Sequence, residues 1–401
     1  MKKPRILVLG AGYGGLMAVT SLQRKVGRTA NITLVDKHEY HYEATWLHEV
    51  AAGNIDADYA SYMISEIIDH SKVKFIQDKV VRIDLENKYV KLKNGQLSYD
   101  YLVIGLGFQA ETYGIPGLQE YAHLITNIHS SLKLKTGLEK KFEDYGKSKP
   151  DKPLTIAVGG SGFTGVEYLG ELVHSIPKLC KKYNVSKNDV RVLSIEAGHK
   201  ILPEFDGKLA AYAKNYLEDN GVQFLINTAI KECYVDQVTV VSNGEVKNIM
   251  TDLLIWTAGV RGNEIIQNLN VESLRSRIIV DPYLRVPGYK DTFVVGDCAL
   301  LIDESKNKPI PPTAQIGMQQ GQYVAKYIAA LIKEGELLTP FSFNNKGCVC
   351  SIGYKKAIGI VFGYRIQGTF ASLMKRVIEN RSLFLISGIR LVLKKRKFRF
   401  F

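Results

Sequence analysis

The sequence has few cysteines for its length, and no two of them stand in the C-x-x-C spacing. The five are Cys180, Cys233, Cys298, Cys348 and Cys350. An odd number without that spacing argues against a secreted disulfide framework and a dithiol reductase, and it favours a reduced cytoplasmic setting. Cys348 and Cys350 would share one face of a strand, and we interpret them as small buried side chains rather than a redox pair.

Long apolar runs are also missing. No uninterrupted hydrophobic stretch approaches the roughly 18 residues that span a bilayer. The N-terminus, MKKPRILVLGAG, places positive charge before apolar residues, but the apolar run ends after four residues at Gly10 without a small-residue cleavage site. We therefore expect a first β-strand there, with no signal peptide and no transmembrane span.

Acidic residues are scarce near the C-terminus. The chain of 401 residues has a net charge of +13, yet residues 370–401 contain nine lysines and arginines and one acid, Glu379. Because the excess is a local tail and not a basic folded surface, the protein is not expected to bind nucleic acid. Apolar residues recur from Phe370 to Val392 at roughly helical spacing. A basic amphipathic segment is typical of an anchor in an anionic membrane surface; the alternatives are a helix packed on the protein or a homodimer contact.

Glycine, in contrast, is abundant, and the motif G-x-G-x-x-G occurs twice. Its glycines are Gly10, Gly12, Gly15, Gly160, Gly162 and Gly165. Each motif follows an apolar strand and opens into a helix, and the next strand ends in an acid, Asp36 or Glu196. Such a loop lets a pyrophosphate approach the backbone at a helix N-terminus, while the acid binds ribose hydroxyls. The carboxylate of Glu196 favours NADH over NADPH, although nearby Lys200 leaves NADPH open.

The whole order of elements around each motif is repeated. Strand, glycine loop, helix, acid-ended strand, β-meander and apolar strand follow one another twice, which indicates a duplicated domain. We predict an α/β fold with two Rossmann-like dinucleotide-binding domains, β-meander insertions and a C-terminal membrane-associating module. The predicted boundaries are 1–112 with 270–335 for the first, discontinuous domain, 113–269 for the second, and 336–401 for the module with the basic amphipathic helix.

The arrangement resembles the two-dinucleotide-domain flavoproteins and, more closely, the type II NADH:quinone oxidoreductases, which are single-chain, non-proton-pumping respiratory NADH dehydrogenases. The resemblance covers essentially the whole chain and rests on the two glycine motifs and on YHYEATWLHEVAAG, WTAGVRG, VVGDCA and PPTAQIGMQQG. It implies a peripheral, monotopic flavoenzyme on the cytoplasmic face of the cell membrane. Such an enzyme oxidises NADH and reduces a membrane quinone through FAD by a ping-pong two-electron mechanism.

The resemblance also implies which residues bind each cofactor. The residues implied for FAD are Gly10, Gly12, Tyr13, Gly14, Gly15, Asp36, Lys37, Thr45, Trp46, Val80, Gly107, Asp297, Ala314 and Gln315. Those implied for NADH are Gly160, Gly162, Phe163, Thr164, Gly165 and Glu196, with Ala258 and Gly259 near the nicotinamide. Asp297 would bond the ribityl chain, and Thr45 and Trp46 would border the flavin ring.

Four residues are the candidates for the reaction itself. By analogy with the family, Glu167 points toward the cofactors and orients nicotinamide or quinone; the alternative is a first-turn acid that stabilises the helix dipole. Gln315 and Gln319 lie one helical turn apart and would donate to quinone oxygens, and Lys375 would reach the same site. We interpret the neighbouring Gln320 as part of an ordinary polar helix face.

A metal site is not expected. His38, His41 and His48 are irregularly spaced and have no cysteine nearby, which is a poor pattern for metal ligands.

Two rival functions stay open at this point. A sulfide:quinone oxidoreductase should carry cysteines beside the flavin, and Cys348 or Cys350 is a candidate without a convincing second partner. The intact second glycine motif favours NADH instead. A membrane-docked flavoprotein that senses NADH and signals through dimerisation, without catalysis, is the rival from another class.

Overall fold

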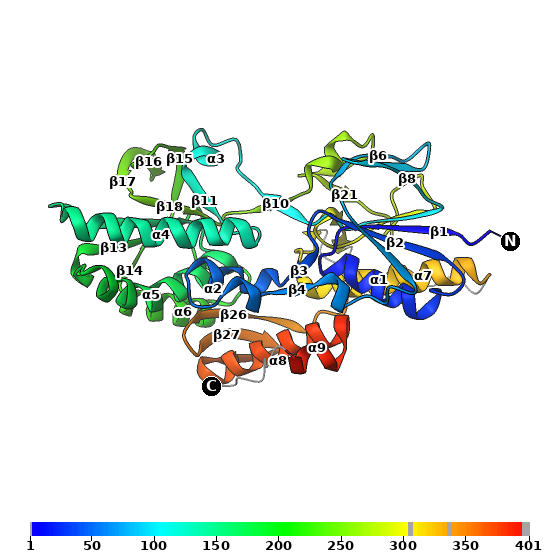
Figure 1. The fold of residues 1–401 in the computed structure, drawn as a ribbon. Helices are drawn as coiled ribbons and strands as arrows, with labels where there is room; N and C mark the ends of the chain where they lie inside the picture. The colour runs from blue at the N-terminus through cyan, green and yellow to red at the C-terminus, as the bar shows by residue number, and fades with distance from the viewer. Residues whose placement is uncertain (1, 304–307, 335–338, 395–401) are drawn as a thin grey trace.

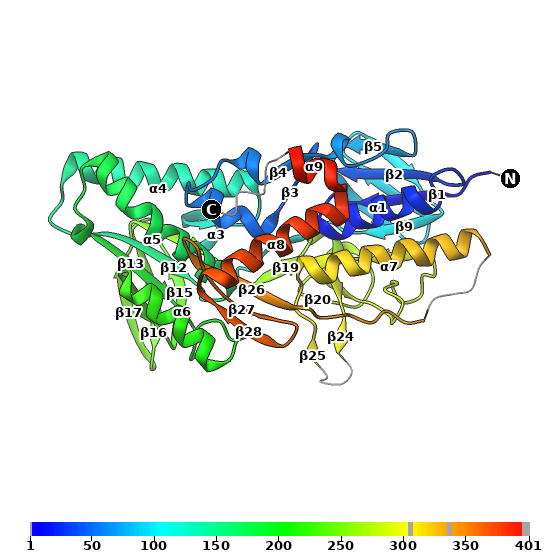
Figure 2. The ribbon, with the colours of Figure 1, turned by 90° about the horizontal axis from the view of Figure 1, so that it is seen from below.

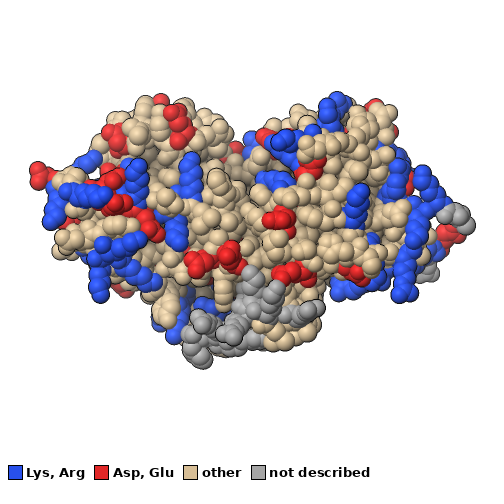
Figure 3. Space-filling view, viewed as in Figure 1, with Lys and Arg blue, Asp and Glu red and all other residues tan. Residues whose placement is uncertain are grey.

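The molecule consists of two α/β lobes placed side by side, with the C-terminal elements lying beneath both (Figure 1). The computed structural model describes residues 2–303, 308–334 and 339–394. A notch separates the two lobes in the space-filling view, and Lys and Arg side chains gather at the outer end over α4 (Ile128–Ser148) (Figure 3).

The first lobe is built on a parallel sheet whose strand order is β22-β9-β1-β2-β5. Its strands are β1 (Arg5–Leu9), β2 (Asn31–Asp36), β5 (Val73–Gln77), β9 (Tyr101–Ile104) and β22 (Thr292–Val294). The strand β22 follows the whole second lobe in the sequence, so the first lobe is built from two separate segments of the chain. Because both faces of the sheet are covered, its strands are apolar runs rather than alternating ones.

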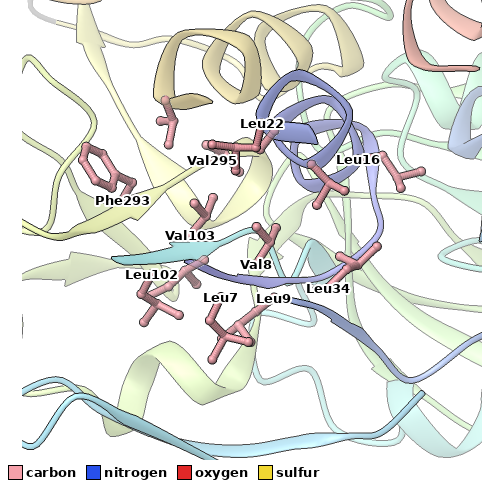
Figure 4. Close-up of a cluster of buried hydrophobic side chains, with 14 of the residues drawn as sticks. Leu7, Val8, Leu9, Leu16, Leu22, Leu34, Leu102, Val103, Phe293 and Val295 are labelled. Atoms are coloured by element: carbon pink, nitrogen blue, oxygen red, sulfur yellow. The ribbon is translucent and has the colours of Figure 1, made fainter. Parts of the chain in front are cut away.

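Two helices from distant parts of the chain cover one face of this sheet. They are α1 (Tyr13–Lys25) and α7 (Ala314–Ile332), which pack against each other. A side chain at Gly321 would come within 2.2 Å of the Gly14 carbonyl oxygen, so the two backbones meet where only glycine fits. Figure 4 shows the core formed where Leu16 and Leu22 of α1 meet the strand residues Val8 and Val103.

The second lobe repeats this design with a parallel sheet in the order β11-β18-β12-β13-β14. Its strands are β11 (Ala122–Leu124), β12 (Leu154–Gly159), β13 (Val190–Ile195), β14 (Val222–Leu225) and β18 (Leu253–Trp256), and its helices besides α4 are α3 (Leu118–Tyr121), α5 (Phe163–Tyr183) and α6 (Gly207–Asp219). The α/β class with Rossmann-like sheets is thereby confirmed.

Each lobe also carries an antiparallel meander, as the sequence predicted. The strands are β6 (Val80–Asp84), β7 (Tyr89–Leu92) and β8 (Gly95–Ser98) in the first lobe, and β15 (Thr228–Cys233), β16 (Gln237–Ser242) and β17 (Glu245–Met250) in the second. The remaining short strands are β3 (Tyr40–Tyr42), β4 (Ser61–Met63), β10 (Phe108–Ala110), β19 (Val260–Gly262), β20 (Ser273–Leu274), β21 (Arg277–Ile279), β23 (Ala299–Leu300), β24 (Ile302–Asp303) and β25 (Lys308–Pro309). Antiparallel pairing of β10 with β19 joins the two lobes.

One segment lies away from the sheet that precedes it in sequence. The helix α2 (Leu47–Ala51) follows β2 and β3 of the first lobe but packs against α4 and α5 of the second. Its residues Leu47 and Val50 belong to the core of that second lobe. The predicted first domain, 1–112, therefore contributes a helix to its neighbour.

The C-terminal module consists of a three-stranded antiparallel sheet and two helices. These are β26 (Gly347–Gly353), β27 (Lys356–Val361), β28 (Tyr364–Gln367), α8 (Gly368–Ser387) and α9 (Ile389–Lys394). The strand β26 packs on α5 of the second lobe, whereas α8 contacts α1 of the first, and Figure 2 shows the module crossing from one lobe to the other. Among the described residues, no helix combines the length and apolar composition that crossing a bilayer requires.

Candidate functional site

The glycines of the first motif divide into two kinds. Gly10 has a φ of +96°, and a side chain there would come within 2.1 Å of the Gly105 carbonyl oxygen. A side chain at Gly15 would come within 1.9 Å of the Gly10 carbonyl oxygen. Gly12, in contrast, has no atom of the described protein within 4 Å of the position that a Cβ would take. Gly10 and Gly15 therefore close the turn, and Gly12 leaves open space that is suited to a ligand phosphate.

The second motif has the same division. Gly160 has a φ of +101°, and a side chain at Gly165 would come within 2.0 Å of the Gly160 carbonyl oxygen. Gly162 faces open space. A side chain at Gly160 would also come within 2.9 Å of the Ala258 backbone, so the predicted nicotinamide residues Ala258 and Gly259 lie directly beside this loop.

The helices that begin at these two loops have no side-chain cap. In both α1 and α5 the N-cap residue is glycine, Gly12 or Gly162, and no side chain bonds the first N–H groups. The helices α6 and α7 are capped in the usual way, by Asp206 and Thr313. Because uncapped N–H groups and the helix dipole attract anions, α1 and α5 are suited to phosphate oxygens.

The acids that end the second strand of each unit hold the glycine loops in place. Asp36 accepts hydrogen bonds from the backbone N–H groups of Ala11 at 2.7 Å and His38 at 2.8 Å. Glu196 accepts them from Ser161 at 2.6 Å and Gly198 at 2.7 Å. Each carboxylate oxygen keeps a further lone pair, so the same acids that shape the loops are able to accept ribose hydroxyls.

A third loop lies at the end of β22 and contains Asp297. Burial raises the pKa of this carboxyl, and the positive charge of Arg277 opposes the shift. The N–H of Gly296 donates to the Gln320 side-chain oxygen at 2.7 Å, and Gln320 is only 1% exposed. The interpretation of Gln320 as a surface residue is therefore wrong: it fixes the loop that presents Asp297. Gly107, across from this loop, accepts a hydrogen bond from the Cys298 thiol at 3.4 Å.

The other residues expected near FAD lie around these loops with varied exposure. The Tyr13 hydroxyl and the Thr45 hydroxyl are 3.4 Å apart. Lys37 is exposed, while Val80 is buried at the start of β6. Trp46 is buried in the core of the second lobe and packs against the ring of Tyr59 at 5.5 Å. The geometry thus gives Trp46 a packing role in addition to any contact with a flavin.

Glu167, in the second turn of α5, is the centre of a buried ionic cluster. The first turn of this helix contains no acidic residue, so the alternative of a first-turn acid that stabilises the helix dipole is wrong. Its carboxylate accepts a hydrogen bond from the Lys375 ammonium of α8 at 2.6 Å and from the Ser351 N–H of β26 at 3.1 Å. The other carboxylate oxygen lies 3.5 Å from Nδ1 of His48 in α2. Lys375 and Glu167 are thereby brought together from positions 208 residues apart.

The electrostatics of this cluster favour an ion pair beside a neutral imidazole. Burial alone would raise the pKa of Glu167, but the charge of Lys375 and the hydrogen bonds from Lys375 and Ser351 oppose burial, and the pKa lies below its usual value. Burial tends to lower the pKa of Lys375, yet Glu167 and Glu379 raise it. Burial lowers the pKa of His48 to about 4. At neutral pH the cluster therefore contains a carboxylate and an ammonium.

A second buried acid, Glu171, lies one turn further along α5. Burial and the negative charge of Glu49 raise its pKa to about 7. The Asn54 side-chain amide donates to its carboxylate at 2.7 Å. The sequence reasoning missed Glu171, although the spacing of Glu167 and Glu171 by four residues places both on one face of the helix. It considered His48 only as a metal ligand, a role that it did not expect.

Gln315 and Gln319 do face the same way, but both amides are bonded to the chain itself. Gln315 donates to the Gly347 carbonyl oxygen at 3.1 Å and accepts from the Lys346 N–H at 2.8 Å. Gln319 donates to the Asn344 carbonyl oxygen and accepts from its N–H, both at 3.0 Å. These hydrogen bonds therefore hold the segment that leads into β26 against α7. Ala314 is the first residue of that helix.

The described cysteines are unpaired, and the thiols on this side of the molecule are poor nucleophiles. Burial raises the pKa of Cys298 to about 12 and that of Cys348 to about 11, and it raises the pKa of Cys350 well above its usual range. Since the thiolate is the reactive form, none of them has the character of a catalytic thiol.

The residues present fit two dinucleotides. Gly12 and Gly162 face open space at uncapped helix N-termini, each with an acid at the next strand end, and Gly107 and Gly296 also have no atom of the described protein within 4 Å of a built Cβ. This combination is what an adenine dinucleotide requires of a Rossmann-like unit.

Comparison with known proteins gives matches over nearly the full chain. Residues 4–321 match the family model described as pyridine nucleotide-disulphide oxidoreductase. The chain is 45% identical to a type II NADH:quinone oxidoreductase of Staphylococcus haemolyticus and 43% identical to that of Staphylococcus aureus, covering 99% of both chains in each case.

Solved structures share the fold at low sequence identity. A structure of NDH2 from Plasmodium falciparum in complex with NADH has a TM-score of 0.85 at 20% identity, covering 99% of each chain. The sulfide:quinone oxidoreductase of Aquifex aeolicus has a TM-score of 0.79 at 19% identity, covering 96% of this chain and 91% of the other.

Proposed function

The chain belongs to the type II NADH:quinone oxidoreductases, and from that premise we propose which of its residues carry the reaction and where it takes place. The enzyme oxidises NADH and reduces a quinone by a ping-pong, two-electron mechanism without proton pumping. Bound FAD supplies the redox chemistry, accepting a hydride equivalent from NADH and returning two electrons to the quinone.

The two glycine loops hold different nucleotides. The Gly10–Gly15 loop, with Asp36 at the adenosine ribose and Asp297 at the ribityl chain, holds FAD. The loop of Gly160, Gly162, Phe163, Thr164 and Gly165, with Glu196, holds NADH. The observation that carries the two nucleotide sites is the pair of open glycines at uncapped helices. The first loop lies beside the Asp297 segment, because a side chain at Gly14 would meet Val295 at 3.0 Å, and this position favours FAD there.

The Glu167–Lys375 pair acts on the quinone side. Lys375 is a buried ammonium with three N–H donors, of which Glu167 takes one. A remaining donor is suited to a quinone carbonyl oxygen, where it stabilises the negative charge that develops on reduction. Glu167 holds the ammonium in that position. Gln315 and Gln319 act indirectly on the same region, because their amides hold the backbone of residues 344–347 in place.

The C-terminal module docks on a membrane. Phe370, Val377 and Phe384 follow one another at intervals of seven residues along α8 and are 58%, 44% and 49% exposed, while Ala371, Leu383 and Ile386 on the opposite side are buried. One face thus packs on the protein and the other is left apolar and open, a combination suited to the lipid interface.

The charges that support docking come from the very end of the chain. The residues Lys395, Arg396, Lys397 and Arg399 lie outside the described residues. Lys375 is not a lipid-facing cation, because its ammonium is buried in the pair with Glu167. We assign the docking face to anionic lipid on the cytoplasmic side, where the quinone reaches the enzyme from the membrane.

Rapid mixing tests this function. The flavin absorbance of the loaded enzyme should bleach with NADH and recover when a quinone analogue is added. The Glu167→Gln variant should bleach at the normal rate but recover more slowly, since only the quinone step uses the pair. A flavin that bleaches and never recovers with any quinone rules out the quinone step. Slow turnover with every acceptor, together with redox-dependent self-association, would favour the sensing function.

The sulfide:quinone rival is disfavoured by the thiols. A sulfide-oxidising flavoenzyme needs reactive cysteines beside the flavin, whereas burial keeps Cys298 and Cys350 protonated. Sulfide should therefore leave the oxidised flavin unbleached under conditions in which NADH reduces it.

A further inference from the structure

A cluster of one histidine and two glutamates, of which one glutamate is half-buried and the other two side chains are buried, lies beside the Glu167–Lys375 pair and has no role in the function proposed above. The helix α2 supplies His48 and Glu49, and α5 supplies Glu171. One ring nitrogen of His48 and one carboxylate oxygen of each glutamate all lie within 4.8 Å of one another. His48 is 2% exposed and Glu171 is 7% exposed. The two helices thus bring three metal-ligand side chains to one place from segments about 120 residues apart.

The histidine has one ring nitrogen to spare. Its Nδ1 faces the Glu167 carboxylate at 3.5 Å. Its Nε2 is buried and has no hydrogen-bond partner among the described residues. A buried polar atom without a partner is destabilising, so such an atom calls for an explanation. This observation is independent of the two acids, and it leaves Nε2 as the nitrogen that is available to a further group.

We propose that His48, Glu49 and Glu171 form a binding site for a divalent transition-metal cation such as Zn²⁺ or Mn²⁺. One imidazole and two carboxylates are ligands that these cations accept, with metal–ligand distances of about 2.0–2.2 Å. Ligand atoms around such an ion lie roughly 3–4 Å apart, so the side chains have to close by about 1 Å on binding.

The groups that surround the three ligands support this assignment. Metal-bound histidines commonly donate their other ring N–H to a carboxylate, which fixes the tautomer. Glu167 is placed to accept that bond from Nδ1 while Nε2 binds the cation. Asn54 donates to one oxygen of Glu171 at 2.7 Å and leaves the other oxygen for the ion. A cation would also separate the two glutamate charges that now face each other.

Binding at this site would reach the catalytic cluster through one side chain. His48 lies between the cation and Glu167, so occupancy strengthens the contact of Glu167 with the imidazole at the expense of its contact with Lys375. We expect a bound cation to slow the recovery of the reduced flavin by quinone and to leave the binding of NADH unchanged.

Titration calorimetry with zinc chloride on the FAD-loaded full chain, freed of metals by a chelator, tests the site. The unaltered protein should bind one Zn²⁺ per chain at this site. His48→Ala and Glu171→Gln should each weaken that binding by at least about tenfold, because removing a ligand affects affinity at least as much as removing an outer group. Flavin content and melting temperature show whether the variants are folded, and Glu171→Gln preserves the side-chain volume.

The matched control is His174→Ala. His174 lies on α5 three residues after Glu171, and its ring stacks on Tyr354 at the surface. This variant should bind Zn²⁺ as the unaltered protein does. Saturable binding that survives in both His48→Ala and Glu171→Gln, or the lack of any saturable binding, overturns the proposal, and so does a loss of binding in His174→Ala alone. None of these results depends on quinone turnover.

Discussion

At the scale of single residues, the free space around each glycine indicates whether that glycine is needed for folding or for ligand binding. Gly15 and Gly165 pack against the backbone of their own loops, whereas a Cβ built at Gly12 or Gly162 has no atom of the described residues within 4 Å. A methyl group added to the first kind collides with the chain. A methyl group added to the second kind is in the way of a ligand only.

The pair Gly162→Ala and Gly165→Ala should therefore give opposite results. Gly162→Ala is expected to keep its flavin and its melting temperature but to bind NADH at least about tenfold more weakly, because the methyl group occupies the space of the phosphates. Gly165→Ala should lower the free energy of unfolding by about 1–3 kcal/mol or more, as overpacking does. Equilibrium titration with NADH and thermal melts check both, and unchanged NADH affinity in Gly162→Ala would contradict the assigned loop.

A charged pair at the start of the neighbouring inner strands β1 and β9 should make stability depend on pH. The Arg5 guanidinium and backbone N–H bond the Asp100 carboxylate at 2.7–3.1 Å and, against a smaller effect of burial, hold its pKa below the usual 3.8. A carboxyl with a lowered pKa stabilises the fold above its unfolded pKa, and this contribution is lost as the pH falls through the folded value.

Asp100→Asn is accordingly expected to be less stable than the unaltered chain by about 0.5–1 kcal/mol near neutral pH, since solvent screens a pair whose side chains are 40% and 44% exposed. The difference should shrink as the pH is lowered below 3.8. Urea unfolding at a series of pH values measures it. A difference that grows toward acid pH would have the wrong sign.

At the scale of elements, the sequence predicted the helices, strands and loops whose pattern depends only on residues close together in the chain. The glycine loops, the acid-ended strands and the meanders are visible because their residues are close in sequence. The surroundings of α7 were not predictable in this way. Gln320 is buried and accepts a hydrogen bond from the Gly296 N–H, and Gln315 bonds the backbone of Lys346 and Gly347. These partners lie 24 to 32 residues away in the chain, beyond the reach of local spacing.

The outer face of α8 carries a prediction of its own. The double variant Val377→Asp with Phe384→Asp should lose most of its binding to anionic vesicles, because each apolar side chain withheld from lipid forfeits about 1.5–3 kcal/mol. Reduction of the flavin by NADH should be unaffected. Co-sedimentation with vesicles measures the change, and Val246→Asp, an exposed apolar site on β17, is the matched control. Equal vesicle binding by the double variant and the control would exclude α8 as the docking face.

At the scale of the whole molecule, the site lies where three parts of the chain meet. The Glu167 cluster takes α5 from the second lobe, α2 from the sequence of the first and α8 from the C-terminal module. The family resemblance supplied Glu167 and Lys375 as separate candidates. Their pairing, and the presence of His48 and Glu171 beside them, depends on how the lobes pack, which no local pattern encodes.

Removal of FAD should destabilise the whole chain, because the cofactor binds only the folded state. With free FAD at a thousandfold excess over its dissociation constant, the holoenzyme should be more stable than the stripped protein by about 4 kcal/mol. Thermal melts with increasing FAD should shift upward accordingly. A melting temperature that does not change with FAD concentration would mean that the first glycine loop does not hold the cofactor.

The contact of α5 with β26 has a consequence for exchanging parts between relatives. A side chain at Gly170 would come within 2.3 Å of the Ile352 carbonyl carbon, so the helix that begins at the nucleotide loop is seated directly on the backbone of the C-terminal sheet. Grafting the C-terminal sheet and helices of this enzyme onto a relative thus requires a glycine at the corresponding position of the relative's helix. Without that glycine, the side chain would push α5 away from the C-terminal sheet in the chimera, and both the nucleotide loop at the start of α5 and the docking helix would be displaced.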